Sequence, residues 1–132
     1  MYFRAMTPHV DGLPMRGRSA RTLGVRVPQD VNPDAAGYVN PGTGGLSVAP
    51  DSMWHVPNHR RPRGMGHGST GPVQDHVFSI APVALRDNRL VARRDPVAPI
   101  VHALIEPQQR VRLEEFERSL DATRPWWQQA WP

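Results

Sequence analysis

The chain is 132 residues long, so the sequence predicts one compact domain rather than two. It contains no cysteine, which excludes disulfides, thiol nucleophiles and cysteine-ligated zinc, and no lysine, which excludes a Schiff base or a P-loop lysine. Its 16 basic residues are all arginine and outnumber the 12 acidic residues to give a net charge of +4, a modest excess that permits nucleic-acid binding without requiring it.

Prolines and glycines are frequent, with 15 and 11 copies, and hydrophobic residues make up 39% of the chain. This composition indicates a folded core surrounded by long irregular loops. No apolar run approaches the roughly 18 residues of a membrane span. Arg4 interrupts the first residues and no long apolar segment follows it, so the sequence predicts no signal peptide. We therefore expect a soluble protein without a membrane partner.

The first half of the chain predicts short strands separated by long loops. Residues 1–6 are aromatic and apolar with one embedded charge, which indicates a first strand. Residues 22–27 alternate between apolar and other side chains and predict a strand or an extended segment. Residues 45–49 predict another strand. The intervening residues 28–44 and 50–75 are rich in proline, glycine and polar side chains and predict loops.

The second half is more regular. Strands are predicted over residues 77–81, 90–92 and 100–105, of which the last is the most β-like run in the chain. A helix is predicted from about residue 108 to residue 122, because Leu113, Phe116 and Leu120 fall on one helical face. Pro125 ends it, and we expect the tryptophans that follow, Trp126, Trp127 and Trp131, to cover the open end of the core.

Arg4 is a candidate phosphate ligand. A guanidinium within an apolar strand is costly to bury unless it meets an anion, and its planar fork suits phosphate. The alternative is that residues 1–6 form an edge strand with Arg4 facing water, and the placement of the charge alone favours this alternative.

His102 and Glu106 are candidate polar groups near the end of the last predicted strand. His102 lies between apolar residues, so its imidazole is a candidate acid–base group or substrate contact, although a satisfied core histidine is the commoner outcome. Glu106 immediately precedes Pro107, where its carboxylate could face a cleft and stabilise a cation or accept a proton. It could equally open the following helix.

The segment Thr43-Gly44-Gly45-Leu46-Ser47-Val48 predicts a turn that leads into a strand. The two glycines would let the backbone approach a ligand closely, and the hydroxyl groups of Thr43 and Ser47 could bond to it. Many surface turns share this composition, so the segment indicates a ligand-binding site only in combination with other motifs of the chain.

The loop of residues 50–75 carries the histidines His55, His59 and His67. Pro57 lies between the first two and prevents the helical spacing that a two-histidine zinc site would use, so a solvated basic loop is the favoured interpretation. Arginines beside it could contact a phosphate-bearing partner or an acidic protein.

Three stretches, taken in order, resemble one family: the small bacterial effector toxins of the ADP-ribosyltransferase fold that are delivered by type VI secretion. Phe3-Arg4-Ala5 matches the aromatic-Arg-Ala element of their first strand. Residues 43–48 match their Thr-Gly-Gly-Thr-Ser-Val motif except at Leu46, where a second hydroxyl is missing. Residues 102–107 keep the outline of their His-x-x-Ile-x-Pro segment, and the final helix and tryptophans match the family's ending.

The resemblance implies an α+β, ADP-ribosyltransferase-like fold over residues 1–132, with short mixed strands in two packed sheets, few helices and long loops. It also implies that the protein binds NAD, cleaves the nicotinamide–ribose bond, and passes ADP-ribose to a macromolecule or to water. Arg4 would hold the NAD phosphates, and Arg4→Ala is then expected to abolish toxicity while leaving the fold intact. Ser47 and Thr43 would support the nicotinamide ribose, and the chain would approach the cofactor at Gly44 and Gly45.

His102 would lie across the cleft near the nicotinamide. Glu106 is the only nearby carboxylate, because no Glu-x-Glu or Gln-x-Glu pair stands on the final strand, and the resemblance leaves its role open. A toxin of this kind implies a cognate immunity or antitoxin protein with acidic residues over the arginine-lined cleft. It would act in the cytoplasm of the producing or target bacterial cell and reach it through a contact-dependent system.

Two other classes of function stay open at this point. One is a basic nucleic-acid-binding module that uses the arginines Arg60, Arg61, Arg63, Arg93 and Arg94. The other is a noncatalytic interaction protein that blocks a partner.

Overall fold

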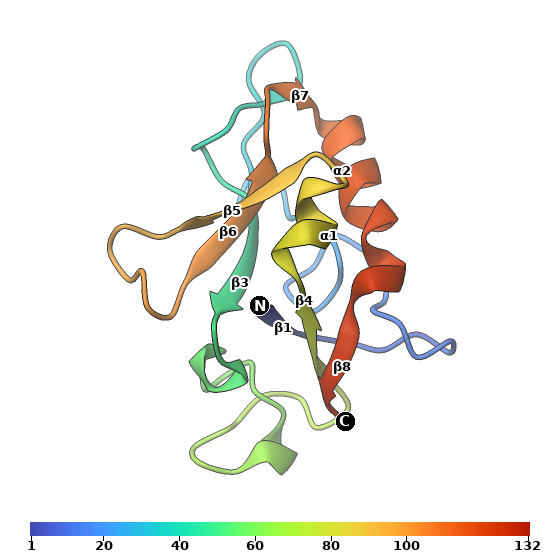
Figure 1. Ribbon diagram of the computed structural model, residues 1–132, viewed down its shortest axis with the longest axis vertical. Helices are drawn as coiled ribbons and strands as arrows, with labels where there is room; N and C mark the ends of the chain where they lie inside the picture. The colour runs from blue at the N-terminus through green and yellow to red at the C-terminus, as the bar shows by residue number, and fades with distance from the viewer.

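The computed structural model describes residues 1–132 and has an α+β fold in which short strands dominate (Figure 1). No helix in it has the length and apolar character needed to cross a membrane. The strands are β1 (Tyr2–Met6), β2 (Tyr38–Val39), β3 (Leu46–Pro50), β4 (His76–Ile80), β5 (Leu90–Arg94), β6 (Ala103–Pro107), β7 (Val111–Arg112) and β8 (Gln128–Trp131). The helices are α1 (Pro82–Arg86), α2 (Leu113–Ala122) and three single 3-10 turns, η1 (Met53–His55), η2 (Arg63–Met65) and η3 (Arg124–Trp126).

The strands form two sheets. Six strands lie in the order β5-β6-β3-β1-β4-β8, and β2 pairs with β7 in a second, two-stranded sheet. Every pairing between these strands is antiparallel, so the mixed arrangement expected from the resemblance is absent. Because β1 has β3 on one side and β4 on the other, it is an inner strand. The Arg4 side chain is only 7% exposed, so the alternative of an edge strand with Arg4 facing water is wrong.

The large sheet opens between β1 and β3. The two strands pair only at Tyr2 with Pro50 and at Phe3 with Ala49. Beyond that point β1 continues along β4, and residues 46–48 of β3 pair with β6 instead. The two halves of the sheet therefore diverge from Arg4 onward. In Figure 1, β1 and β4 run across and down from the opening, whereas β3 and β6 rise away from it.

Strand alternation divides the core into two clusters. Met6, Phe78 and Ile80 belong to the main cluster, which the apolar face of α2 completes with Phe116 and Leu120. The predicted helical face is thus confirmed, although the helix begins at Leu113, because Val111 and Arg112 pair with β2. Neighbouring positions on the strands, including Ala5 and Val77, form a smaller cluster.

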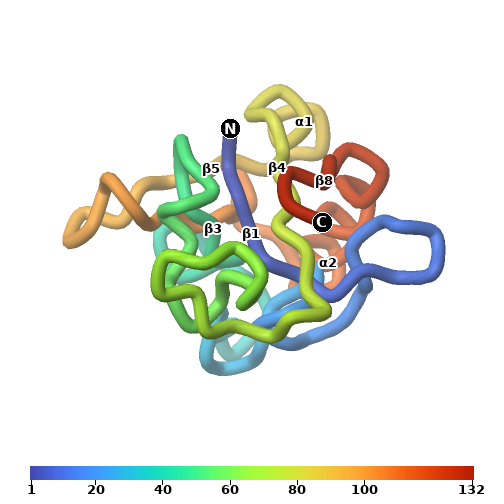
Figure 2. The backbone as a smooth tube through the Cα atoms, turned by 90° about the horizontal axis from the view of Figure 1, so that it is seen from below, coloured from blue at the N-terminus to red at the C-terminus, as the bar shows by residue number.

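The loop after β3 is ordered. It packs η1 against β1 and β3 and lies at the end of the molecule below these strands (Figures 1 and 2). At its centre the buried Arg61 donates hydrogen bonds to three carbonyl oxygens, to Asn58 and to Ser69. A guanidinium has five N–H groups in a rigid fork, so one side chain fixes most of the turns of this loop.

Three predicted elements differ from the structure. Residues 22–27 do not form a strand, because the Thr22 carbonyl bonds to the Arg4 guanidinium and Leu23 makes only a single bridge to Arg16. The run 100–105 enters the sheet only at Ala103, so that Ile100 and Val101 lie in an exposed turn. Only Trp127 of the final tryptophans is buried, and the residues after it form β8.

Candidate functional site

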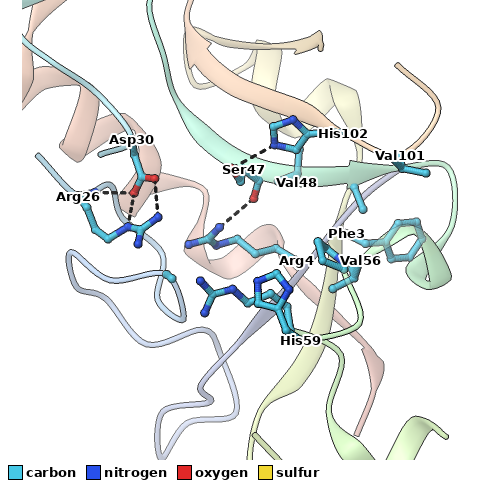
Figure 3. Close-up of a pocket in the computed structure, with 15 residues that line it drawn as sticks. Phe3, Arg4, Arg26, Asp30, Ser47, Val48, Val56, His59, Val101 and His102 are labelled. Carbon is cyan, nitrogen blue, oxygen red and sulfur yellow. Dashed lines mark hydrogen bonds and ion pairs between the residues drawn. The ribbon is translucent and has the colours of Figure 1, made fainter. Parts of the chain in front are cut away.

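A pocket of about 230 Å³ occupies the opening between β1 and β3. Figure 3 shows its residues converging from both halves of the sheet and from the loop after β3. The polar lining residues include Arg4, Arg26, Asp30, Ser47, Arg60 and His102. Three of the residues predicted from distant parts of the sequence, Arg4, Ser47 and His102, therefore come together at one site.

Arg4 forms part of the pocket wall and is only 7% exposed. It donates to main-chain oxygens alone: to Ser47 at 2.8 Å from Nη1, to Ser19 at 3.3 Å and Thr22 at 3.0 Å from Nη2, and to Thr22 from Nε. These four bonds leave one of the five N–H groups of the guanidinium, on Nη1, without a protein partner. Burial lowers the pKa of Arg4 to about 10, so the side chain is still cationic at neutral pH.

The pocket has an excess of positive charge. Arg26 is balanced by Asp30, which accepts hydrogen bonds from its Nε and Nη2 atoms at 3.1 and 3.0 Å. Arg60 is half-buried and its guanidinium makes no hydrogen bond or ion pair with another side chain. Arg4 also has no carboxylate in contact. Two guanidinium groups without a counter-ion in one cavity favour an anionic ligand, because an anion would remove the repulsion between them.

Ser47, His102 and Asp95 form a chain of hydrogen bonds at the edge of the pocket. The Ser47 hydroxyl lies 3.2 Å from Nε2 of His102, and Nδ1 of the same ring lies 2.9 Å from Oδ2 of Asp95. The His102 and Asp95 side chains are 34% and 30% exposed. A carboxylate on Nδ1 favours the tautomer whose Nε2 accepts, so that the ring can take the proton of the Ser47 hydroxyl.

The turn between β5 and β6 holds this chain of bonds in place. Its ends are joined by the bond from Asp95 N to the His102 oxygen at 3.0 Å, and His102 N donates to Ala98 at 3.0 Å. The Asp95 carboxylate also accepts from Val97 N at 2.9 Å. Two hydrogen bonds lower the pKa of Asp95 and keep its carboxylate ionised: the bond from His102 contributes most, and the bond from Val97 N contributes next. Ser47 is presented from β3, where it pairs with Leu104 of β6.

The remaining predicted residues do not line the pocket. Thr43 is exposed and donates to the Asn40 oxygen. Gly44 and Gly45 let other parts of the main chain, rather than a ligand, come close. A Cβ at these positions would collide with the main-chain oxygens of Asp30 and Ile105, respectively. Gly45 N also donates to the Asp30 oxygen at 3.0 Å. The glycine pair thus packs the residue-30 turn against β6 and does not reach a ligand.

Glu106 is also directed elsewhere. Its carboxylate is buried, accepts from Gly42 N at 2.9 Å and pairs with Nε of Arg93 at 3.2 Å. Glu106 lies four positions after His102, near the other end of β6, and does not line the cavity. It ties the loop before β3 to the sheet, and the catalytic role considered for it has no support in this geometry.

The histidines of the loop after β3 do not converge. His55 Nδ1 lies 2.8 Å from the Pro50 oxygen, His67 packs edge-on against Trp54, and His59 lines the pocket. No three His, Cys, Asp or Glu side chains are grouped so that they could hold a metal ion.

Sequence reasoning missed Asp95, Arg26 and Asp30. Asp95 is separated from His102 by a turn that contains Pro96 and Pro99. Because prolines favour a tight turn, they were the one signal in the sequence that could have placed Asp95 beside His102. Arg26 and Asp30 have the spacing of a helical ion pair in a segment without a helix, so nothing in the sequence pointed to a pocket there.

No family model, no curated protein and no solved structure matches this chain. The pocket can attract an anion through Arg4 and Arg60, and it places a hydroxyl beside an imidazole that a carboxylate orients. These are the requirements for binding a phosphorylated ligand and for moving a proton at a defined atom.

Proposed function

We propose that this protein is a bacterial toxin of the ADP-ribosyltransferase type, which binds NAD and breaks the bond between nicotinamide and ribose. ADP-ribose would pass to a macromolecule in the cell or to water. The observation that supports this most is that Arg4, Ser47 and His102, which are far apart in the sequence, line the same pocket. The resemblance assigned these residues to the phosphates, the ribose and the nicotinamide end of one molecule.

The charges of the pocket suit the pyrophosphate of NAD. Arg4 has one N–H group of Nη1 free, and Arg60 has its whole guanidinium free, to contact phosphate oxygens. The cavity of about 230 Å³ is smaller than the roughly 300–1,000 Å³ of pockets that bury a drug-sized ligand. We therefore expect it to enclose the nicotinamide and its ribose phosphate, with the adenosine lying outside.

The chemical step separates charge on the ribose. As the glycosidic bond breaks, its electron pair leaves with nicotinamide and the ribose carbon becomes cationic. Asp30 is the only carboxylate that lines the pocket, and hydrogen bonds from Arg26 outweigh the opposing effect of burial to lower its pKa. An ionised Asp30 is thus better placed than Glu106 to stabilise this charge. Ser47 would bond to the ribose hydroxyls, and His102 would take a proton from the acceptor.

The proposal includes its partners and place of action. A toxin of this kind needs a cognate immunity or antitoxin protein, and acidic residues on that protein would complement Arg4 and Arg60 at the mouth of the pocket. The site of action would be the bacterial cytoplasm of the producing or a target cell, reached by a contact-dependent secretion system. The acceptor is a macromolecule or water.

The nucleic-acid alternative gains no support from the side chains that it would use. Arg61 is buried within its loop, and Arg93 and Arg94 are paired with Glu106 and Asp51. Only Arg60 and Arg63 of the predicted basic set lack such partners, and two arginines neutralise few phosphates.

The test uses the whole protein, NAD and a matched pair of variants. Arg60→Ala removes a pocket cation, whereas Arg63→Ala removes an exposed arginine three residues away that does not line the pocket. We expect NAD to raise the melting temperature of the parent and of Arg63→Ala, and to raise that of Arg60→Ala much less. The parent and Arg63→Ala should also release free nicotinamide from NAD.

A folded parent protein that neither releases nicotinamide nor gains thermal stability with NAD would overturn the proposal. If such a protein still stops bacterial growth, it acts by blocking a partner. Binding to DNA or RNA with a steep dependence on salt would instead favour the nucleic-acid alternative.

A further inference from the structure

We propose that Asp95, His102 and Ser47 form a proton relay that makes the Ser47 hydroxyl a covalent nucleophile toward carboxylic esters that carry a negative charge. This activity goes beyond NAD cleavage and does not depend on it, although it uses the same pocket. The catalytic residues would be Ser47 and His102, and Asp95 would be a positioning residue that acts through His102.

The order of the hydrogen bonds supports the relay. Ser47 Oγ contacts His102 Nε2 at 3.2 Å, and the opposite ring nitrogen contacts Asp95 Oδ2 at 2.9 Å. The hydroxyl of Ser47 makes no other hydrogen bond to the protein, so its proton is available to the imidazole. A nucleophile, a base and a group that orients the base, in this sequence of contacts, define the arrangement by which serine is activated on unrelated folds.

Ser47 comes from a strand, whereas Asp95 and His102 close the turn between β5 and β6, and the backbone fixes each of them. Ser47 is in β3, whose register with β6 puts it opposite Leu104, two residues after His102. The turn that carries Asp95 is closed by the main-chain bond between Asp95 and His102. A nucleophile on a strand and a base in the hydrogen-bonded turn directly before the neighbouring strand are held more firmly than groups on free loops.

The charges of the pocket define the substrate class. Arg4 and Arg60 line the same cavity as Ser47 and His102 and have no carboxylate in contact. They would attract a carboxylate or phosphate group of the substrate, and their positive charge would stabilise the oxyanion that forms when a carbonyl is attacked. The size of the cavity, about 230 Å³, restricts the enclosed part to a small acyl group.

The step balances within these residues and the substrate. Ser47 Oγ forms a bond to the ester carbonyl carbon while its proton moves to His102 Nε2. The bond between that carbon and the leaving alkoxy oxygen then breaks, and the departing oxygen takes the proton from His102. Water repeats the sequence on the acyl-serine: it gives a proton to His102 and releases the acid, and Ser47 regains its proton.

The first experiment measures covalent labelling of the whole protein by diisopropyl fluorophosphate, in which Ser47 Oγ would form a bond to phosphorus as fluoride leaves. Mass spectrometry of peptides would locate the label. We expect it on Ser47, at a rate that falls by about 10²–10⁴-fold in His102→Gln and in Asp95→Asn. His59→Gln is the matched control, because His59 lines the pocket without contacting Ser47.

The second experiment compares two chromogenic esters, the anionic 4-nitrophenyl hemisuccinate and the neutral 4-nitrophenyl acetate. The parent should prefer the anionic ester, and Arg60→Ala should lose this preference. Asp95→Asn should lower kcat far more than it changes KM, because Asp95 does not line the pocket.

Melting temperatures would confirm that each variant is folded. The proposal is overturned if the folded parent takes no label on Ser47, or if Asp95→Asn and His102→Gln label as fast as His59→Gln. The NAD measurements are independent of it, since a protein that fails to bind NAD can still label at Ser47, and the reverse also holds.

Discussion

Arg4 of β1 donates a hydrogen bond of 2.8 Å to the main-chain oxygen of Ser47 in β3, and so spans the place where these two strands separate. The same guanidinium bonds to Ser19 and Thr22, which have no strand partner for their carbonyl groups. Arg4 therefore closes the open edge of the sheet while it forms the wall of the pocket. The resemblance alone assigned it only the second of these roles.

Substitution of Arg4 is consequently expected to cost stability as well as activity. Arg4→Ala removes a donor from three buried or half-buried carbonyl groups, of which Ser19 keeps the N–H and hydroxyl of Thr22 as donors, and we expect a loss of about 2–4 kcal/mol in the free energy of unfolding. Urea denaturation of Arg4→Ala and Arg60→Ala measures the difference, because Arg60 supplies charge to the same pocket without bonding to these carbonyl groups. Equal stability of Arg4→Ala and the parent would contradict the structural role.

Glu106 is expected to act on stability alone. Glu106→Gln keeps the size of the side chain but removes the charge that pairs with Arg93 and weakens the acceptor for Gly42 N. We expect the free energy of unfolding to fall by about 1–3 kcal/mol, whereas nicotinamide release and Ser47 labelling per folded molecule stay at parental values. If a folded Glu106→Gln variant no longer releases nicotinamide, Glu106 takes part in the reaction and the purely structural role is wrong.

The elements that the sequence predicted well are those with a local signal. The first strand, the strands around residues 46–50 and 76–80, and the apolar face of α2 all follow from short-range periodicity. The strand predicted for residues 22–27 is wrong because Leu23 and Val25 enter the core without strand pairing, and the Thr22 carbonyl accepts from the guanidinium of Arg4 rather than from a neighbouring strand. That contact joins residues 18 positions apart, which no local pattern records.

The pocket could be predicted only in part for the same reason. Arg4, Ser47 and His102 were identifiable as unusual polar residues in or beside apolar runs. Asp95 was hidden because its role depends on the closure of a turn, and Glu106 was overestimated because its partner Arg93 lies on the neighbouring strand. Sequence spacing identifies residue types for a site, whereas strand register decides which of them meet.

Gly45 offers a steric test of the turn before β3. Gly45→Ala would place a Cβ against the main-chain oxygen of Ile105, which cannot move without disturbing β6, so we expect a loss of about 1–3 kcal/mol in the free energy of unfolding. Gly64→Ala is the control, since a Cβ there meets open space and its backbone needs no positive φ. Thermal melts of the two variants make the comparison, and similar melting temperatures would refute the packing role.

Asp34 predicts a specific loss of stability in acid. Its carboxylate accepts from the main-chain N–H of Tyr38 and from Asn40, and these bonds lower its pKa from 3.8 to about 2. The folded pKa lies below the unfolded one, so the stabilisation is complete above about pH 4 and is lost as the pH falls toward about 2. At pH 7, Asp34→Asn should have a lower melting temperature than the parent. Between about pH 4 and about pH 2, its melting temperature should fall less than that of the parent.

The control for this measurement is Asp87→Asn, because the exposed Asp87 carboxylate makes no side-chain hydrogen bond or ion pair. It should follow the parent across the whole pH range. If Asp34→Asn and the parent lose melting temperature in parallel, the carboxylate of Asp34 does not contribute to acid stability.

Arg61 is expected to determine the order of the loop after β3. Arg61→Ala removes the donor to five acceptors, and Arg61→Lys cannot replace it, because an ammonium on a flexible stem does not reproduce the fork of a guanidinium. We expect both variants to lose at least about 2 kcal/mol of stability. Hydrogen exchange should rise over residues 53–70 in both, but not in the neighbouring Arg63→Ala, whose arginine is exposed.

Since this loop contributes Arg60 to the pocket, NAD should stabilise Arg61→Ala less than Arg63→Ala. Parental exchange rates in Arg61→Ala would show that the loop is ordered by its turns alone.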